Sequence, residues 1–278
     1  MDSTLAKGLA ALDWLARQQR DCRVVEVAQA LGLARSNAHR TLQTLVECGW
    51  ALRNPANSTY RASLRLFELG GLVDGAMDLK ALLRPHLAAL ALECGETIHL
   101  ASLEGADIVY LDKFDSPLPV AAYSRIGGRA PAYCVASGKA LLAALELDEA
   151  TLKQRLGPLQ AHTPHSLTDY PSLMAELDRT RVRGWAENRE EWRVGVCGLG
   201  APVFNARGEP VVAVGMSVPS IRFTRGQART LQARLSACAR EACRTLGYAP
   251  TEQAIRTRSP PLDPLPAHTS TSPYRRQA

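Results

Sequence analysis

The hydrophobic spacing changes near residue 50, and this change limits the folds open to the first part of the chain. Apolar residues recur at steps of three or four over residues 5–15 and 24–31, which predicts two amphipathic helices. A third run of this kind follows Gly32 and ends at Gly49. Two short helices joined at a tight glycine turn predict a helix-turn-helix.

A strand-like pattern follows the third helix. Residues 50–53 and 59–62 are separated by the polar, turn-rich segment 54–58, which predicts a β-hairpin. A hairpin in this place is the wing of a winged helix-turn-helix. We therefore assign residues 1–62 to one domain with this fold and expect it to bind DNA.

The charge distribution favours the same function. The chain has a formal net charge of +6, and residues 1–62 hold eight Lys or Arg against five Asp or Glu. A basic segment on a nearly neutral body indicates an acidic partner, most commonly nucleic acid. The segment 249–278 contains six prolines and many Ser and Thr residues, and we expect a disordered tail.

The third helix supplies side chains that suit DNA. Arg35 or Arg40 can bond a guanine and Asn37 an adenine, whereas serine and threonine suit phosphate oxygens. Position 34, where an N-cap serine or aspartate is expected, is Ala34. The candidate DNA-binding residues, with one arginine from the wing, are Arg35, Ser36, Asn37, His39, Arg40, Thr44 and Arg53.

The rest of the chain has the pattern of an α+β fold. We assign a linker helix to residues 63–78 and a second domain to residues 79–248. Strand-like runs separated by short turns predict an antiparallel sheet with helices packed on it. The expected strands are 97–103, 108–114, 120–126, 195–205 and 209–218, and the expected helices are 81–94, 137–145, 170–183 and 225–246.

Several ordered blocks resemble the IclR family of bacterial transcriptional regulators over roughly residues 4–248. The blocks lie at residues 30–36 with His39 and Arg40, 96–101, 109–113, 127–131, 136–140, and from 190 to 203. The resemblance implies that the second domain is a GAF-like, effector-binding domain. It also implies a dimer or dimer of dimers on a palindromic operator.

The same resemblance implies an effector site in the second domain. Backbone amides at the start of the helix at Ala136 and Ser137 would hold a carboxylate, as exposed N–H groups at a helix start do. Asn188 and Ser217 would be polar contacts. The candidate effector-binding residues are Ala122, Tyr123, Ala130, Tyr133, Ala136, Ser137, Asn188, Cys197, Gly198, Gly215 and Ser217.

The chain departs from the family pattern at this site. Asn188 stands where many members carry an acidic residue, so an anionic effector is easier to accept. The family cysteine is displaced to Cys197, and Gly198 and Gly215 replace larger residues, which predicts a roomier pocket. Cys197 and Gly198 point to opposite faces of a strand, so only one of them can line the site.

Other chemistry is weakly supported. Lys139 lacks the glycine and the following Ser or Thr of a phosphate loop, and His162 and His165 lack nearby metal ligands. The cysteines are scattered and seven in number, so we expect neither disulfides nor zinc and interpret most as buried apolar residues. We expect no cofactor and no enzymatic activity.

The predicted function is therefore a sequence-specific transcriptional regulator whose DNA binding is controlled by a small carboxylate or aromatic acid. No apolar stretch is long enough to cross a bilayer and no secretion signal is apparent, so we expect a cytoplasmic protein. Two alternatives remain open. The second domain could serve only to dimerise, or it could be a thiol hydrolase with Cys134 as its nucleophile.

Overall fold

The computed structural model describes residues 3–71, 76–122 and 124–248 and divides into two compact units, Met1–Met77 and Asp78–Ala278. The predicted tail at 249–278, Tyr123 and part of the predicted linker helix lie outside the described residues. None of the described helices combines the length and apolarity needed to span a membrane.

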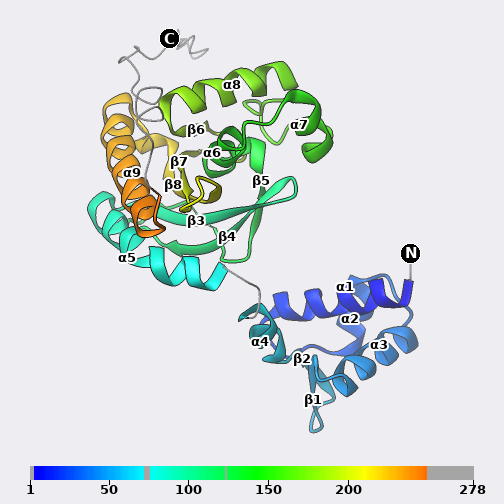
Figure 1. The fold of residues 1–278 in the computed structure, drawn as a ribbon. Helices are drawn as coiled ribbons and strands as arrows, with labels where there is room; N and C mark the ends of the chain where they lie inside the picture. The colour runs from blue at the N-terminus through cyan, green and yellow to red at the C-terminus, as the bar shows by residue number, and fades with distance from the viewer. Residues whose placement is uncertain (1–2, 72–75, 123, 249–278) are drawn as a thin grey trace, which may run out of the picture. The chain divides into compact units, whose positions relative to one another are not determined.

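The N-terminal unit contains the predicted helix-turn-helix (Figure 1). Helices α1 (Ser3–Gln18), α2 (Val24–Ala30) and α3 (Arg35–Glu47) enclose a small apolar core, to which α3 contributes Leu42 and Leu45. Gly32 adopts φ +62°, as expected for the glycine of the turn, and the Leu33 amide donates to the Ala28 carbonyl at 2.9 Å. The predicted helix-turn-helix is confirmed.

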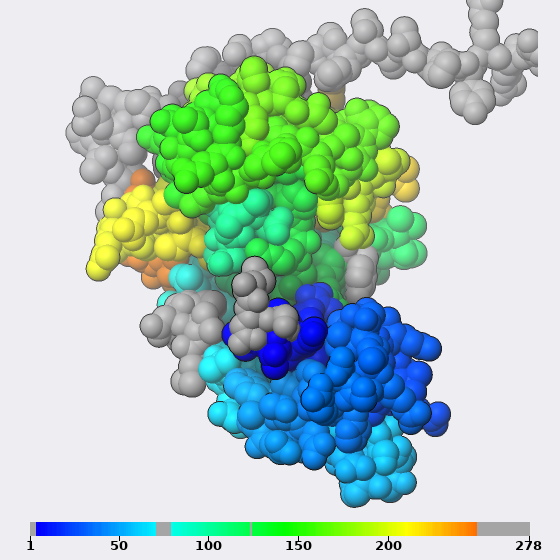
Figure 2. All heavy atoms as spheres, turned by 90° about the vertical axis from the view of Figure 1, so that its right-hand side faces the viewer, coloured from blue at the N-terminus to red at the C-terminus, as the bar shows by residue number. Residues whose placement is uncertain are grey.

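The predicted hairpin is formed by β1 (Ala51–Asn54) and β2 (Thr59–Ala62), and its tip projects from the body of the N-terminal unit (Figures 1 and 2). Cys22, before α2, exchanges two backbone hydrogen bonds of 2.8 Å with Tyr60 of β2. The hairpin is thus attached by its backbone to the entry of the helix-turn-helix. Helix α4 (Arg65–Gly71) follows.

The C-terminal unit is built on one antiparallel sheet with strand order β5-β4-β3-β8-β7-β6, which confirms the α+β prediction. The connections β3–β4 and β7–β8 are the two predicted short turns. The strands are β3 (Thr97–Glu104), β4 (Asp107–Phe114), β5 (Arg129–Pro131), β6 (Ala186–Arg189), β7 (Val196–Phe204) and β8 (Pro210–Pro219).

Helices cover both faces of this sheet (Figure 1). Helices α5 (Ala76–Cys94) and α9 (Arg225–Thr245) pack their apolar side chains on one face. Helix α6 (Ala136–Ala144) lies on the other face, with α7 (Glu149–Leu156) and α8 (Tyr170–Arg183) packed beyond it. The alternation of side chains along each strand therefore separates an α5/α9 face from an α6 face.

The predicted strand at 120–126 is wrong, since no described residue of that segment lies in a strand. Its carbonyl groups are bound by side chains instead: Arg222 donates to Val120 O at 2.8 Å, and Thr97 donates to Ala122 O at 3.3 Å. The strand that follows β4 in the sequence is instead β5, which begins at Arg129. The sequence analysis also missed β6 and α7, because both segments are largely polar.

Two glycines allow the start of α6 to lie directly against neighbouring backbone. A Cβ atom on Gly138 would lie 2.3 Å from Ala132 O, and a Cβ atom on Gly200 of β7 would lie 2.4 Å from the carbonyl carbon of Ala136. Real side chains do not approach backbone so closely. Glycine is therefore required at both positions for the observed packing.

We expect Gly138→Ala to lower the free energy of unfolding of the C-terminal unit by about 1 to 3 kcal/mol or more, because the added methyl group overlaps backbone rather than a flexible side chain. Gly226→Ala is the matched control, since Gly226 also lies in a helix but has no atom within 4 Å of the new Cβ. Denaturant unfolding would measure both variants. Equal effects would contradict the proposed cause.

Candidate nucleic-acid interface and ligand site

Helix α3 separates an apolar face from a polar one. Ala38, Leu42 and Leu45 are buried, whereas the predicted DNA-binding side chains lie on the outer side. Asn37 is half-buried, whereas the wing residue Arg53 is exposed. The exposed members of the predicted set on α3 are Arg35, Ser36, His39, Arg40 and Thr44.

Three of the predicted residues are joined by hydrogen bonds on this surface. The Arg40 guanidinium donates to Asn37 Oδ1 at 2.8 Å, and the Thr44 hydroxyl donates to the Arg40 carbonyl at 3.1 Å. The first bond occupies the oxygen that Asn37 would need for bidentate contact with an adenine. In this arrangement Asn37 orients Arg40, and the guanidinium is the more exposed of the two polar groups.

The start of α3 has Ala34 as its N-cap and no side-chain hydrogen bond, as the sequence indicated. Its first backbone N–H groups therefore have no side-chain acceptor from the cap. Exposed amides at a helix start attract anions such as phosphate oxygens. The missing cap is compatible with a surface that meets a polyanion.

Three of the predicted effector-binding residues, Asn188, Gly198 and Ser217, lie in one row across the α6 face of the sheet. The strand register places Asn188 beside Gly198, Gly198 beside Ser217, and Ser217 beside Thr97. Asn188 is buried and Ser217 is half-buried. The sheet thus brings together residues that lie more than a hundred positions apart in the sequence.

The start of α6 adjoins this row. Its N-cap is Val135, which makes no side-chain hydrogen bond to the helix. A Cβ atom on Gly198 would lie 2.8 Å from Met216 O and 3.9 Å from the Ala136 methyl group, so the helix start lies over Gly198 and the predicted extra room at this glycine is also wrong. The buried amides of Ala136 and Ser137 consequently stand next to the row that contains Asn188 and Ser217.

The predicted roomier pocket at Gly215 is wrong. A Cβ atom there would lie 3.3 Å from Ser137 Cβ, so the missing side chain is replaced by the helix. The prediction for Cys197 also needs correction, because its side chain lies on the α5/α9 face among the buried apolar residues. Of the pair, Gly198 is the residue on the α6 face.

The remaining predicted residues lie near the row or beyond it. Ala130 and Tyr133 belong to the apolar cluster on the α6 face, and the Tyr133 hydroxyl donates to Gln160 O at 2.9 Å. Ala122 is buried, and its carbonyl accepts the bond from Thr97. Tyr123 cannot be placed, since it lies outside the described residues.

Sequence reasoning missed His99, which lies on the α6 face beside Gly215. Its Nε2 atom is 2.7 Å from the Ser124 hydroxyl, and its ring centroid is 4.7 Å from that of Tyr110. Burial, and secondarily the charge of Lys113, lowers the pKa of His99 to about 4. The imidazole is therefore polar but uncharged at neutral pH. The sequence signal for this residue was a histidine inside a largely apolar strand segment, residues 97–103.

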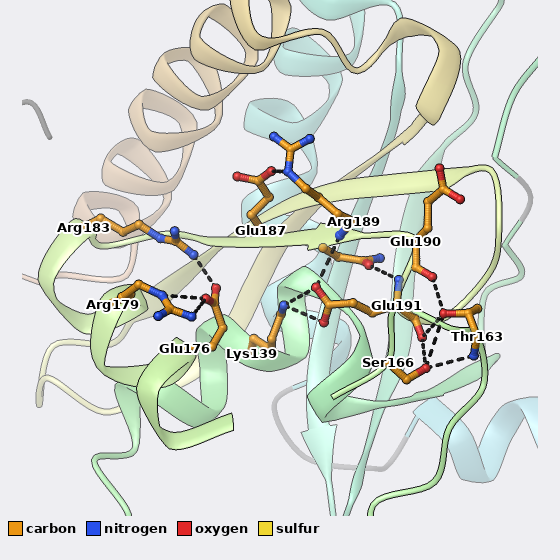
Figure 3. Close-up of polar contacts among 11 residues, drawn as sticks. Lys139, Thr163, Ser166, Glu176, Arg179, Arg183, Glu187, Arg189, Glu190 and Glu191 are labelled. Atoms are coloured by element: carbon orange, nitrogen blue, oxygen red, sulfur yellow. Dashed lines mark hydrogen bonds and ion pairs between the residues drawn. The ribbon is translucent and has the colours of Figure 1, made fainter. Parts of the chain in front are cut away.

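A buried ion pair fixes α6 to the turn after β6. Lys139 Nζ lies 2.7 Å from both carboxylate oxygens of Glu191, and the two side chains point toward each other (Figure 3). The Glu191 amide in turn donates to Asn188 Oδ1 at 2.9 Å. Burial raises the pKa of Glu191 above its usual range, although Lys139 opposes this shift. Lys139 is thus a structural cation.

The other chemistry weighed from the sequence gains no support. Cys134 is buried, and burial raises the pKa of its thiol to about 12, so it is not an activated nucleophile. Within the described residues no cluster of three or more His, Cys, Asp or Glu side chains is placed to hold a metal. All seven cysteines are free, and five are buried.

Both units of the chain match one family of proteins. Residues 4–55 match the IclR helix-turn-helix domain, and residues 73–244 match the domain described as bacterial transcriptional regulator IclR C-terminal. The chain belongs to the IclR family. The HTH-type transcriptional regulator XynR from Escherichia coli (strain K12) is 32% identical over 247 residues, which cover 88% of this chain and 97% of XynR.

Solved IclR structures share the fold. The IclR of Thermotoga maritima has a TM-score of 0.72 and 31% identity, covering 89% of this chain and 100% of its own. An IclR homologue from Microbacterium hydrocarbonoxydans, complexed with 4-hydroxybenzoate, has a TM-score of 0.75 and 22% identity, covering 88% and 99%. This IclR protein is thus a DNA-binding transcriptional regulator with a ligand-binding C-terminal domain, as predicted.

Removing the lysine of the buried Lys139–Glu191 pair should lower the stability of the protein in a pH-dependent way. Lys139→Met leaves Glu191 buried without its cation, and we expect a loss of about 3 to 5 kcal/mol in the free energy of unfolding at neutral pH. The pKa of Glu191, already above its usual range, should rise further. A carboxyl group whose pKa is higher in the folded than in the unfolded protein lowers the stability of the folded protein at high pH. Acidification from about pH 8 to about pH 5 should therefore restore part of the lost free energy of unfolding.

The double variant Lys139→Met/Glu191→Leu is the control. It removes both charges, so it should be more stable than Lys139→Met and should lack the pH-dependent recovery. Denaturant unfolding followed at several pH values measures both properties. A Lys139→Met variant whose stability loss is independent of pH would contradict the assignment of Glu191 as the unpaired charge.

Proposed function

We propose that this IclR-family regulator binds a palindromic operator through α3 and the wing, and that a small carboxylate, aromatic in the favoured case, controls this binding. The protein acts as a dimer or a dimer of dimers, in the cytoplasm, and has no enzymatic activity. Residues 1–62 form the DNA-binding domain, 63–78 the linker helix and 79–248 the effector domain. The observation that carries the DNA-binding assignment is the polar outer face of α3.

Arg40 is the leading base-reading side chain in this proposal. It is exposed and held by Asn37, so it is oriented before DNA arrives. Arg35, Ser36, Asn37, His39 and Thr44 complete the contact surface on α3, and Arg53 contributes from the wing. Serine and threonine hydroxyls, together with the uncapped start of α3, engage phosphate oxygens.

The effector carboxylate binds between the start of α6 and the row of Asn188, Gly198 and Ser217. Oδ1 of Asn188 is already bound to the Glu191 amide, so the NH₂ group is the part available to donate to an anion. The 4-hydroxybenzoate complex of the Microbacterium homologue supports an aromatic acid as the ligand class. The remaining proposed site residues are Ala122, Ala130, Tyr133, Ala136, Ser137 and Gly215.

A second candidate role for the C-terminal unit is dimerisation alone. Ligand binding to the folded state raises the melting temperature, because it adds RT ln(1 + [L]/Kd) to the stability. A panel of aliphatic and aromatic carboxylates, measured by thermal unfolding, separates the two roles. A flat response over the whole panel would favour dimerisation alone.

We expect Arg40→Ala to weaken operator binding by about 1 to 3 kcal/mol and to relax specificity at one base pair, as the loss of a guanine contact does. Arg17→Ala is the control, because Arg17 is an exposed arginine of the same unit that pairs with Asp13 on α1. Fluorescence anisotropy with the DNA upstream of the gene would measure both. Unchanged affinity for Arg40→Ala would remove this residue from the interface.

We expect Asn188→Asp to lower affinity for benzoate at least about tenfold, because a negative charge beside a partly buried carboxylate is costly. The aspartate retains the oxygen that accepts from the Glu191 amide, so the turn should persist. DNA binding without ligand should not change. Asn205→Asp, in the β7–β8 turn, is the matched control for isothermal calorimetry. Equal or tighter binding to Asn188→Asp would show that the carboxylate lies elsewhere.

A further inference from the structure

The turn between β6 and β7, residues 190–195, is held rigidly beside the proposed effector site. The Thr163 hydroxyl donates to the Glu190 carbonyl at 2.7 Å, and the Ser166 hydroxyl donates to the Glu191 carbonyl at 2.6 Å (Figure 3). The Gly195 amide closes the turn by donating to the Glu190 carboxylate at 3.0 Å. Side chains on this turn are therefore presented from a fixed backbone.

Trp192, on this turn, reaches the apolar cluster of the α6 face that contains Ala130 and Tyr133. Its ring meets that of His162 edge-on, with centroids 4.5 Å apart. His162 in turn lies 3.2 Å from the Tyr133 hydroxyl through its Nε2 atom. The turn and the loop before α8 thus place an indole and an imidazole against residues already assigned to the effector site.

Arg193 follows Trp192 and lies with its guanidinium carbon 5.9 Å from the centre of the indole ring. It is exposed, and within the described part of the chain its guanidinium has no ion pair or hydrogen bond. The arginine at the other end of the turn differs, because Arg189 pairs with Glu187. Arg193 is therefore a cation on a rigid turn without an internal counter-charge.

The charge of Arg193 also acts on the hydroxyl group of Tyr110 of β4. Burial raises the pKa of the Tyr110 hydroxyl to about 12, and Arg193 opposes that rise. In the sheet order, β3 and β8 lie between β4 and the strands that carry the turn. Tyr110 and Trp192, the neighbour of Arg193, both pack against the apolar cluster of the α6 face.

We propose that Arg193 is a specificity-determining residue that binds a second acidic group of the effector, so that the preferred ligand is an aromatic dicarboxylic acid. This inference rests on the proposed carboxylate site at the start of α6. One carboxylate binds there, the ring lies among Trp192, His162 and Tyr110, and the second carboxylate receives the guanidinium. Arginine suits this role because its fork of N–H groups matches a carboxylate in bidentate geometry.

Calorimetry with benzoate and with the benzene dicarboxylates tests this assignment on the full-length protein. We expect at least one diacid to bind the unmodified protein about tenfold or more tightly than benzoate, equivalent to about 1.4 kcal/mol. Arg193→Met should reduce this preference to near one while leaving benzoate affinity almost unchanged. Arg193→Lys should retain part of the preference, since it keeps the charge but not the fork.

Arg207→Met is the matched control, because it removes the same charge from an exposed turn between β7 and β8. It should keep the full preference for the diacid. If benzoate binds but no diacid is preferred, or if Arg193→Met keeps the preference, the role of Arg193 is wrong and the carboxylate site stands. If neither benzoate nor any diacid binds the unmodified protein, both assignments are wrong.

Discussion

The C-terminal unit depends on the contact between the start of α6 and the backbone of the sheet. Gly200 admits the peptide of Ala136 at a distance that no side chain would allow, and Gly138 lets the same helix lie against the backbone of Ala132. Helix amides are thereby buried beside strand residues instead of facing solvent. A polar group in such a place must find a partner, which is why this junction is suited to a ligand.

The two faces of the sheet differ in polarity. The α5/α9 face holds an almost continuous apolar core that includes Leu100, Leu199 and Val214. The α6 face carries His99 and Ser217 in the same strands, β3 and β8, and Asn188 in the neighbouring strand β6. Side-chain alternation therefore lets one sheet be an ordinary core on one side and a polar binding surface on the other.

Sequence reasoning succeeded where a local pattern controls the structure and failed where tertiary contacts decide. Helix α8 and the turn at Gly32 were predictable, because spacing and turn chemistry act over a few residues. The segment 120–126 was not, since its carbonyls are bound by the distant side chains of Thr97 and Arg222. The predicted extra room at Gly215 was wrong for a related reason, because Ser137 of α6 occupies the space that the missing side chain leaves.

The paired backbones of Cys22 and Tyr60 have a consequence for control. They join the wing to the entry of α2, so the hairpin and the helix-turn-helix are held together by backbone hydrogen bonds. A change in the shape of this unit would break those bonds. If two copies of the chain share one operator, as proposed above, an effector would therefore act by changing the distance between two rigid units along the DNA.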